Sequence, residues 1–132
     1  MNVIAIKKRT RKPANYRKML EVDSNAKTSK GRKLGYLTGI MYLAPADSSG
    51  VMNVCINASP ECKDDCLFTS GLASVHPSIN EARIRKTVFL HAHYDDAIAS
   101  IAWDIEGLVN KANKLEPVER RRSPWSGGVV QP

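Results

Sequence analysis

Three cysteines with metal-ligand chemistry stand close together near the middle of the chain. Cys55, Cys62 and Cys66 fall in the string NVCINASPECKDDC, and they are the 3 cysteines of the chain. A helix over residues 63–68 would place the thiols of Cys62 and Cys66 one turn apart on the same side, and the intervening Ser-Pro turn would return Cys55 beside them. Three thiolates suit zinc with one further ligand, or an iron–sulfur cluster with one iron left open.

The fourth zinc ligand would be a histidine. We take His76 as the candidate, with His91 and His93 as alternatives. Two interpretations without a metal stay open, namely inert thiols that behave as small hydrophobic groups and thiols with redox or catalytic chemistry. An odd number of cysteines in a cytosolic setting argues against a secreted disulfide scaffold.

The positive charge is concentrated at the start of the chain. The net charge is +7, from 20 basic and 13 acidic residues, and residues 1–33 hold 11 basic residues against only Glu21 and Asp23. Such a basic arm repels itself, buries little surface and attracts a polyanion by releasing counterions. We therefore expect nucleic acid as the partner, and a surface that only aids solubility is the alternative. The candidate contacts in the arm are Lys7, Lys8, Arg9, Arg11, Lys12, Arg17, Lys18, Lys30, Arg32 and Lys33.

One apolar run in the first half of the chain indicates a strand. Residues 34–44 (LGYLTGIMYLA) are apolar on both alternating faces and stop at Pro45, which is typical of a buried strand. We expect this strand at the centre of the core. Residues 23–33 before it are rich in Ser, Asn, Thr, Lys and Gly, a composition that predicts a loop.

Two helices are expected in the second half of the chain. Ser78 and Glu81 have the spacing of a reciprocal capping box, and helical periodicity follows to about Ala92. Apolar residues then recur every three or four positions over residues 95–115, which predicts an amphipathic helix. Acidic residues at its amino end and lysines at its carboxyl end agree with the helix dipole.

The length of 132 residues is that of one domain. We expect an α+β fold in which a short sheet packs against two helices, with the cysteine-rich loop closing one end. Its parts would be a basic arm over 1–33, a globular core over 34–118 and an irregular tail over 119–132. No apolar run approaches the length of a membrane span, and the apolar start precedes the first lysines, the reverse of a signal peptide. We therefore expect a cytoplasmic protein that binds no membrane.

Several separated motifs follow one another between residues 26 and 118: GYLT, LAP, a cysteine box ending in CLFTSG, and ARIRKT. In this combination the chain resembles an uncharacterised family of proteins encoded by tailed bacteriophages and prophages. The resemblance implies a metal or iron–sulfur site at the three cysteines, with radical-SAM-like phage proteins as distant relatives, and it makes Arg83 and Lys86 candidate basic contacts. The sequence after Pro117 departs from the family pattern, so a C-terminally truncated member is expected.

Three functions remain open. The first is a small phage or prophage protein that binds nucleic acid through its basic arm and holds a cysteine-ligated metal. The second is an inhibitor or modulator of a host protein, such as a defence or replication complex. The third is a metal-dependent enzyme acting on nucleic acid, with Glu61, Asp64 or Asp65 as acid or base. No pattern in the sequence assigns a catalytic residue.

Overall fold

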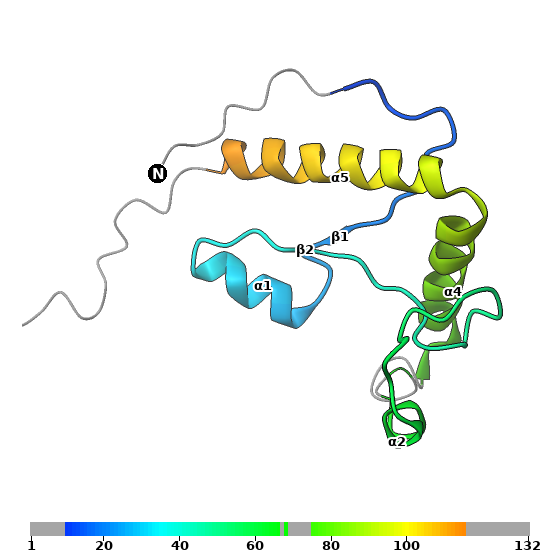
Figure 1. Ribbon diagram of the computed structural model, residues 1–132. Coiled ribbons are helices and arrows are strands. Elements are labelled where there is room, and N and C mark those ends of the chain that lie inside the picture. The colour runs from blue at the N-terminus through cyan, green and yellow to red at the C-terminus, as the bar shows by residue number, and fades with distance from the viewer. Residues whose placement is uncertain (1–9, 67, 69–74, 116–132) are drawn as a thin grey trace, which may run out of the picture.

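The computed structural model describes residues 10–66, 68 and 75–115 (Figure 1). Within these residues the order of elements is β1 (Glu21–Val22), α1 (Ala26–Lys33), β2 (Gly39–Ile40), α2 (Pro60–Asp64), α4 (Pro77–Ala92) and α5 (Tyr94–Lys114). The two short strands pair antiparallel, with Glu21 opposite Ile40 and Val22 opposite Gly39. A small two-stranded sheet combined with helices confirms the predicted α+β class.

The long helices α4 and α5 confirm the helical periodicity of the second half of the chain. Only His93 stands between them, and the chain turns a corner there (Figure 1). The first turn of α5 holds Asp95 and Asp96, and its last turn holds Lys111 and Lys114. Each charge therefore lies at the end of the helix where the dipole stabilises it.

The start of α4 differs from the prediction. Pro77 occupies its first turn, and the cap residue is His76, which makes no side-chain cap hydrogen bond. Proline is favoured at the first helical position because the N–H that it lacks would have no partner there. Ser78 consequently lies inside the first turn, and the predicted capping box between Ser78 and Glu81 does not cap the helix.

The strand predicted over residues 34–44 is wrong for most of its length. Only Gly39–Ile40 pairs as a strand. Leu34 is the C-cap of α1, and Gly35 follows with a φ of 87°, a conformation that suits glycine because it has no Cβ. The side chains of Leu34 and Tyr36 are 75% and 69% exposed, so this apolar run does not form the centre of the core.

Residues 26–33 form helix α1 where the composition predicted a loop. Asn25 accepts the backbone N–H of Thr28 at 3.0 Å, and its own N–H donates to Thr28 Oγ1 at 3.3 Å. This reciprocal arrangement is a capping box. Lys30, Arg32 and Lys33 in the last turn complement the helix dipole. Asn, Ser and Thr are favoured at helix caps as well as in loops, so composition alone could not separate the two.

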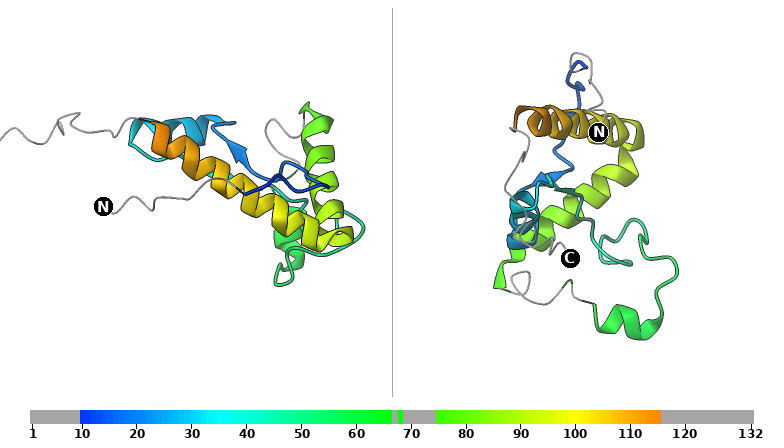
Figure 2. Two further views of the ribbon diagram at one scale, coloured as in Figure 1. Left: turned by 90° about the horizontal axis from the view of Figure 1, so that it is seen from above. Right: turned by 90° about the vertical axis from the view of Figure 1, so that its left-hand side faces the viewer.

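The core lies where residues 10–20 cross the two long helices. Met19 is fully buried beside Phe89 of α4 and Ala97 of α5, and Leu90 and Ile101 pack around them. Figure 2 shows this part of the chain, drawn in dark blue, crossing close to the corner between α4 and α5. The described part of the basic arm is therefore packed into the fold, and the expectation that the arm buries little is wrong at Met19.

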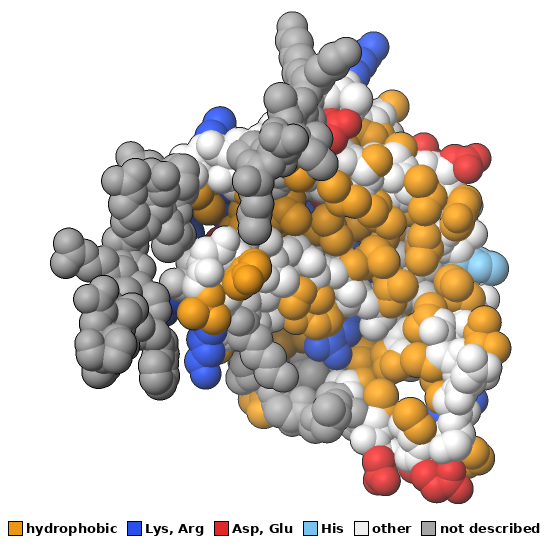
Figure 3. All heavy atoms as spheres, turned by 60° about the vertical axis from the view of Figure 1, so that its left-hand side comes forward, with side chains coloured by type: hydrophobic (Ala, Val, Ile, Leu, Met, Phe, Trp, Pro, Cys, Tyr) orange, Lys and Arg blue, Asp and Glu red, His pale blue; other side chains and the backbone are white. Residues whose placement is uncertain are grey.

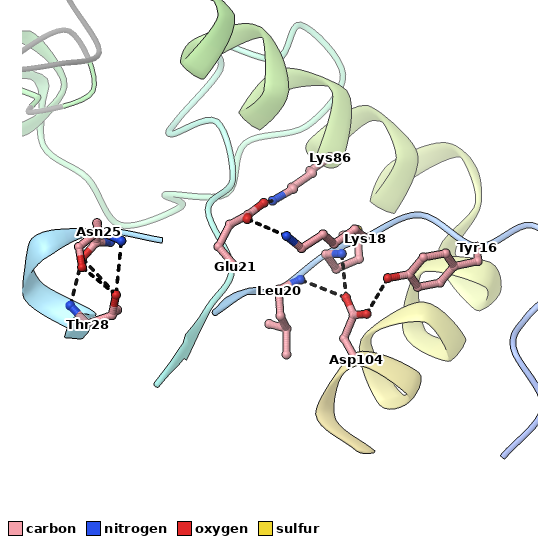
Figure 4. Close-up of polar contacts among 9 residues, drawn as sticks. Tyr16, Lys18, Leu20, Glu21, Asn25, Thr28, Lys86 and Asp104 are labelled. Atoms are coloured by element: carbon pink, nitrogen blue, oxygen red, sulfur yellow. Dashed lines mark hydrogen bonds and ion pairs between the residues drawn. The ribbon is translucent and has the colours of Figure 1, made fainter. Parts of the chain in front are cut away.

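One carboxylate on α5 fixes the path of this segment. Asp104 accepts the backbone N–H groups of Met19 at 2.8 Å and Leu20 at 3.0 Å, and the hydroxyl of Tyr16 at 2.7 Å (Figure 4). Backbone amides turned toward a helix need such an acceptor because an unpaired buried N–H is costly. The carboxylate thus holds the chain where the side chain of Met19 enters the core.

Much apolar surface stays outside this small core. Figure 3 shows hydrophobic side chains spread across a wide area of one face, with scattered basic and acidic side chains among them and at the margins. On α5, Ile98 and Ile105 are 44% and 46% exposed. Even so, none of the described helices is long and apolar enough to cross a membrane.

Candidate functional site

The three cysteines line one pocket. This cysteine pocket has a volume of about 430 Å³ and is formed by the cysteine loop, residues 45–66, together with Phe68. The loop begins directly after Ala44, which is buried and donates its N–H to Thr87 Oγ1 of α4 at 2.9 Å. The lining residues are Pro45, Ala46, Asp47, Ser48, Cys55, Ala58, Cys62, Lys63, Asp64, Cys66 and Phe68.

The short helix α2 presents one of the three thiols. Ser59 caps it by accepting the N–H of Cys62 at 3.2 Å, and Pro60 stands in its first turn. The helix ends at Asp64, so of the helix predicted over residues 63–68 only Lys63 and Asp64 belong to α2, and Cys66 lies beyond it. Lys63 reaches across to Asp47 at 3.2 Å, and Figures 1 and 2 show α2 well away from α5.

A metal site requires the ligands to converge. Among the described residues, no group of three or more Cys, His, Asp or Glu side chains is arranged to hold a metal ion. His76, the predicted fourth ligand, precedes α4 and does not line the cysteine pocket. The three thiols line the same pocket. The metal stays a prediction from the sequence.

The charge pattern of the N-terminal third depends on its two acidic residues. Glu21 on β1 pairs with two lysines, Oε1 lying 2.8 Å from Lys86 Nζ and Oε2 3.0 Å from Lys18 Nζ (Figure 4). Partial burial alone would raise the pKa of Glu21, but hydrogen bonds and charge from Lys86 and Lys18 outweigh this and lower the pKa below its ordinary value. The Lys86 side chain is only 11% exposed, so the structure places it in an ion pair rather than on a contact surface.

Asp23 is shared between two further cations. Its Oδ2 lies 3.4 Å from Arg32 Nη1 on α1 and 3.2 Å from Lys111 Nζ on α5. Both acidic residues of the first 33 positions therefore have two basic partners each. Neither is left to offset the remaining cations of this part of the chain.

Two of the predicted contacts lie against aromatic rings. The guanidinium of Arg83 is 5.3 Å from the ring centroid of Tyr42 and 5.4 Å from that of Phe68. Lys12 Nζ lies 4.4 Å from the ring centroid of Tyr16. Such cation–π contacts hold a cation in place without neutralising its charge.

Five of the predicted nucleic-acid contacts are exposed and form no ion pair with another described residue. They are Arg11, Lys12, Arg17, Lys30 and Lys33. The first three lie on the segment that leads into the core, and the last two lie on α1. Lys7, Lys8 and Arg9 fall outside the described residues. Exposed cations without carboxylate partners retain their full charge for a ligand.

A second pocket joins one of these cations to α4. This arginine pocket has a volume of about 330 Å³, and Arg17 and Arg85 line it from two separate parts of the chain. Its other lining residues are Asn15, Ile84, Val88, Phe89, Ala92 and His93. Arg17 was predicted as a nucleic-acid contact and His93 only as an alternative zinc ligand, whereas Arg85 was not predicted as a site residue. The sequence pattern that could have indicated Arg85 is the helical spacing of residues 85, 88 and 92, which puts them on one face of α4.

The comparisons with known proteins identify a family. No curated protein and no solved structure matches the chain. A family model described as Gene product 88 matches residues 14–127, which includes both pockets and all three cysteines. The phage origin implied by the motifs of the sequence agrees with this match. The chain therefore belongs to the Gene product 88 family, a family of phage gene products.

Proposed function

We propose that this phage protein binds nucleic acid through the exposed cations of its N-terminal third. The observation that carries the proposal is the distribution of ion pairs. Glu21 and Asp23 are both engaged by basic side chains. The cations that they do not reach stay exposed on the first described segment and on α1.

The physical basis is the release of counterions. A lysine or arginine that meets a phosphate displaces a condensed cation from the nucleic acid, and the entropy gained favours binding. Cations already paired with carboxylates contribute less, because the pair must be broken or shared. Arg11, Lys12, Arg17, Lys30 and Lys33 therefore support the proposal better than Lys18, Arg32 and Lys86 do.

The test is the salt dependence of binding. Fluorescence anisotropy with labelled duplex DNA, single-stranded DNA and RNA would give the dissociation constant at several salt concentrations. Each phosphate neutralised on duplex DNA changes the slope of log affinity against log salt by about 0.9. Five contacts give a slope of roughly −4 to −5. An affinity that does not change with salt would contradict the proposal.

Two variants of equal charge sharpen the experiment. Arg11→Gln with Lys12→Gln removes two proposed contacts and should flatten the slope by about 2. Lys63→Gln with Lys114→Gln removes the same net charge from exposed positions outside the N-terminal third. If both pairs flatten the slope equally, the binding reflects net charge and not the proposed surface.

The same experiment separates this proposal from an action on a host protein. A host partner captured by the full chain after nuclease treatment, with no binding to any of the three nucleic acids, would favour the host-protein alternative. Such a partner would be recognised by complementary charge, and its association would also slow at high salt. Direct binding to purified nucleic acid is therefore the measurement that distinguishes nucleic-acid binding from action on a host protein.

A further inference from the structure

The arginine pocket brings two cations together without a carboxylate among its lining residues. Arg17 comes from the segment that crosses α5, and Arg85 comes from α4. Of the nearby acids, Glu81 pairs with Arg85 itself at 3.3 Å, and Asp96 accepts the side-chain amide of Asn15 at 2.8 Å. Neither acid lines the pocket, so its lining carries a net positive charge.

Both arginines are held in ways that leave donors available. The guanidinium of Arg17 lies 5.3 Å from the centre of the Phe89 ring, and its backbone N–H donates to Ser100 Oγ at 3.3 Å. The Arg85–Glu81 pair is weak because both side chains are more than half exposed. A guanidinium has five N–H donors, so each arginine keeps donors for a ligand.

The rest of the pocket suits a single anionic group. Phe89 and the apolar residues Ile84, Val88 and Ala92 form part of the wall. Apolar walls exclude water and strengthen a nearby charge–charge interaction. The ring of His93 lies 5.6 Å from that of Phe89 and offers a further nitrogen at the end of α4.

We propose that the arginine pocket is a phosphate-binding site. The guanidinium groups of Arg17 and Arg85, which line the same pocket from two separate parts of the chain, would donate to the oxygens of one phosphate, for which arginine is the preferred side chain. The proposal that the pocket binds phosphate rests only on the arrangement of its side chains. The source of the phosphate, which is a nucleic-acid backbone or its 5′ end, rests on the proposed function.

The first experiment uses inorganic phosphate as the probe. Amide spectra of the full ¹⁵N-labelled chain are recorded during a titration with phosphate, and again with chloride at equal ionic strength. Saturable shifts at Arg17, Arg85 and His93 that phosphate alone produces are expected. Phosphate shifts that match those with chloride would overturn the proposal.

Variants locate the site. Arg17→Gln with Arg85→Gln should weaken phosphate binding by at least about tenfold, because each arginine contributes charge-assisted hydrogen bonds. Lys63→Gln with Lys114→Gln loses the same charge from exposed positions that do not line the arginine pocket, and it should change phosphate binding less than about twofold. Equal losses in both pairs would overturn the proposal.

A further variant guards against misfolding of the first. Val88 is 37% exposed on α4 and lines the pocket, so Val88→Glu introduces a carboxylate without disturbing Arg17 or Phe89. It should abolish phosphate binding while the thermal unfolding midpoint stays unchanged. Phosphate binding retained in a folded Val88→Glu chain would contradict the proposal.

Oligonucleotides with and without a 5′-phosphate distinguish the two sources. A terminal site predicts at least about tenfold tighter binding of the phosphorylated strand. A backbone site predicts equal binding of both strands, and a larger loss in the Arg17/Arg85 variant than in the Lys63/Lys114 variant. Binding of phosphate but of no oligonucleotide would refute the proposed function and keep the pocket. Equal oligonucleotide losses in these two variants would refute the pocket as a nucleic-acid contact, and a larger loss in the Arg11/Lys12 variant would then keep the proposed function.

Discussion

The segment of residues 10–22 and the cysteine loop of residues 45–66 are held in place in different ways. The first carries the fully buried Met19 and ties three of its polar groups to Asp104. No residue of the cysteine loop is buried, and short-range turns and the cap of α2 provide most of its hydrogen bonds.

This difference shows where the structure supports a precise site. The residues that line the arginine pocket belong to α4 and to a segment fixed by buried contacts, so the backbone that carries their side chains is held by packing. The thiols of the cysteine pocket stand on a loop without a core of its own. A loop of that kind has a low free energy of local opening. Four predictions test the contrast, beginning with the largest effect.

Truncating Met19 should give the largest loss of stability. Met19→Ala removes a fully buried side chain from a core of few residues, which costs about 3 kcal/mol. Denaturant unfolding of the variant measures this loss. Met41→Ala is the matched control, because Met41 is 37% exposed and should cost less than about 1 kcal/mol. Equal losses at the two positions would mean that the segment is not anchored by its core contact.

Neutralising Asp104 should have the second largest effect. Asp104→Asn keeps the shape but removes the charge and one of the two oxygens that together accept three hydrogen bonds, at a cost of about 2 kcal/mol. Asp95→Asn on the same helix is the control, with a loss of a few tenths of a kcal/mol from the helix dipole. Amide exchange should also accelerate at Met19 and Leu20. Unchanged exchange there would show that Asp104 does not hold the segment.

Glu21 should make stability depend on pH in the acid range. Its pKa is lowered in the folded chain from an ordinary value of 4.5. Its ion pairs therefore stabilise the fold above about pH 4.5, and this contribution is lost as pH falls through the lowered pKa. Glu21→Gln should cost about 1 kcal/mol at pH 7 and progressively less toward pH 3. Glu81→Gln, which alters an exposed pair, should change little at either pH, and a cost at Glu21 that is independent of pH would be inconsistent with the ion pairs.

Changing a cysteine should have the smallest effect on the metal-free chain. Cys62 is exposed, so Cys62→Ser should alter the free energy of unfolding by less than about 0.5 kcal/mol. Elemental analysis of protein purified without oxygen or added metal belongs with this measurement. Stoichiometric zinc or iron that disappears in the variant, with a loss of several kcal/mol, would support the metal prediction and reverse the contrast between the two regions.

Parts of the fold that depend on local pattern were predictable. The periodicity of residues 95–115 predicted α5 correctly, because apolar residues at helical spacing form one face of a helix whatever segment packs against that face. The prediction of a buried strand over residues 34–44 was wrong because an apolar run has the same composition whether its side chains are buried or exposed. Whether a side chain is buried depends on which segment packs against it. The segment that contains Met19 packs against Phe89 and Ala97 in the core, where the strand of residues 34–44 was expected.

The candidate sites divide in the same way. The clustering of cysteines is visible in the sequence, and they do share a pocket, but convergence of ligands is a property of three-dimensional geometry. Arg85 was not selected because its partner Arg17 lies far away in the sequence. Only packing of the first segment on α4 brings the two together.

The two long helices, the excess of basic residues before residue 34 and the clustering of thiols could be predicted because each follows from residue types at short spacing. Which cations remain available depends on the tertiary fold. Lys86 reaches Glu21 across 65 positions and Lys111 reaches Asp23 across 88. An ion pair depends on distance in space, and no local pattern encodes which lysine the fold brings to a given carboxylate.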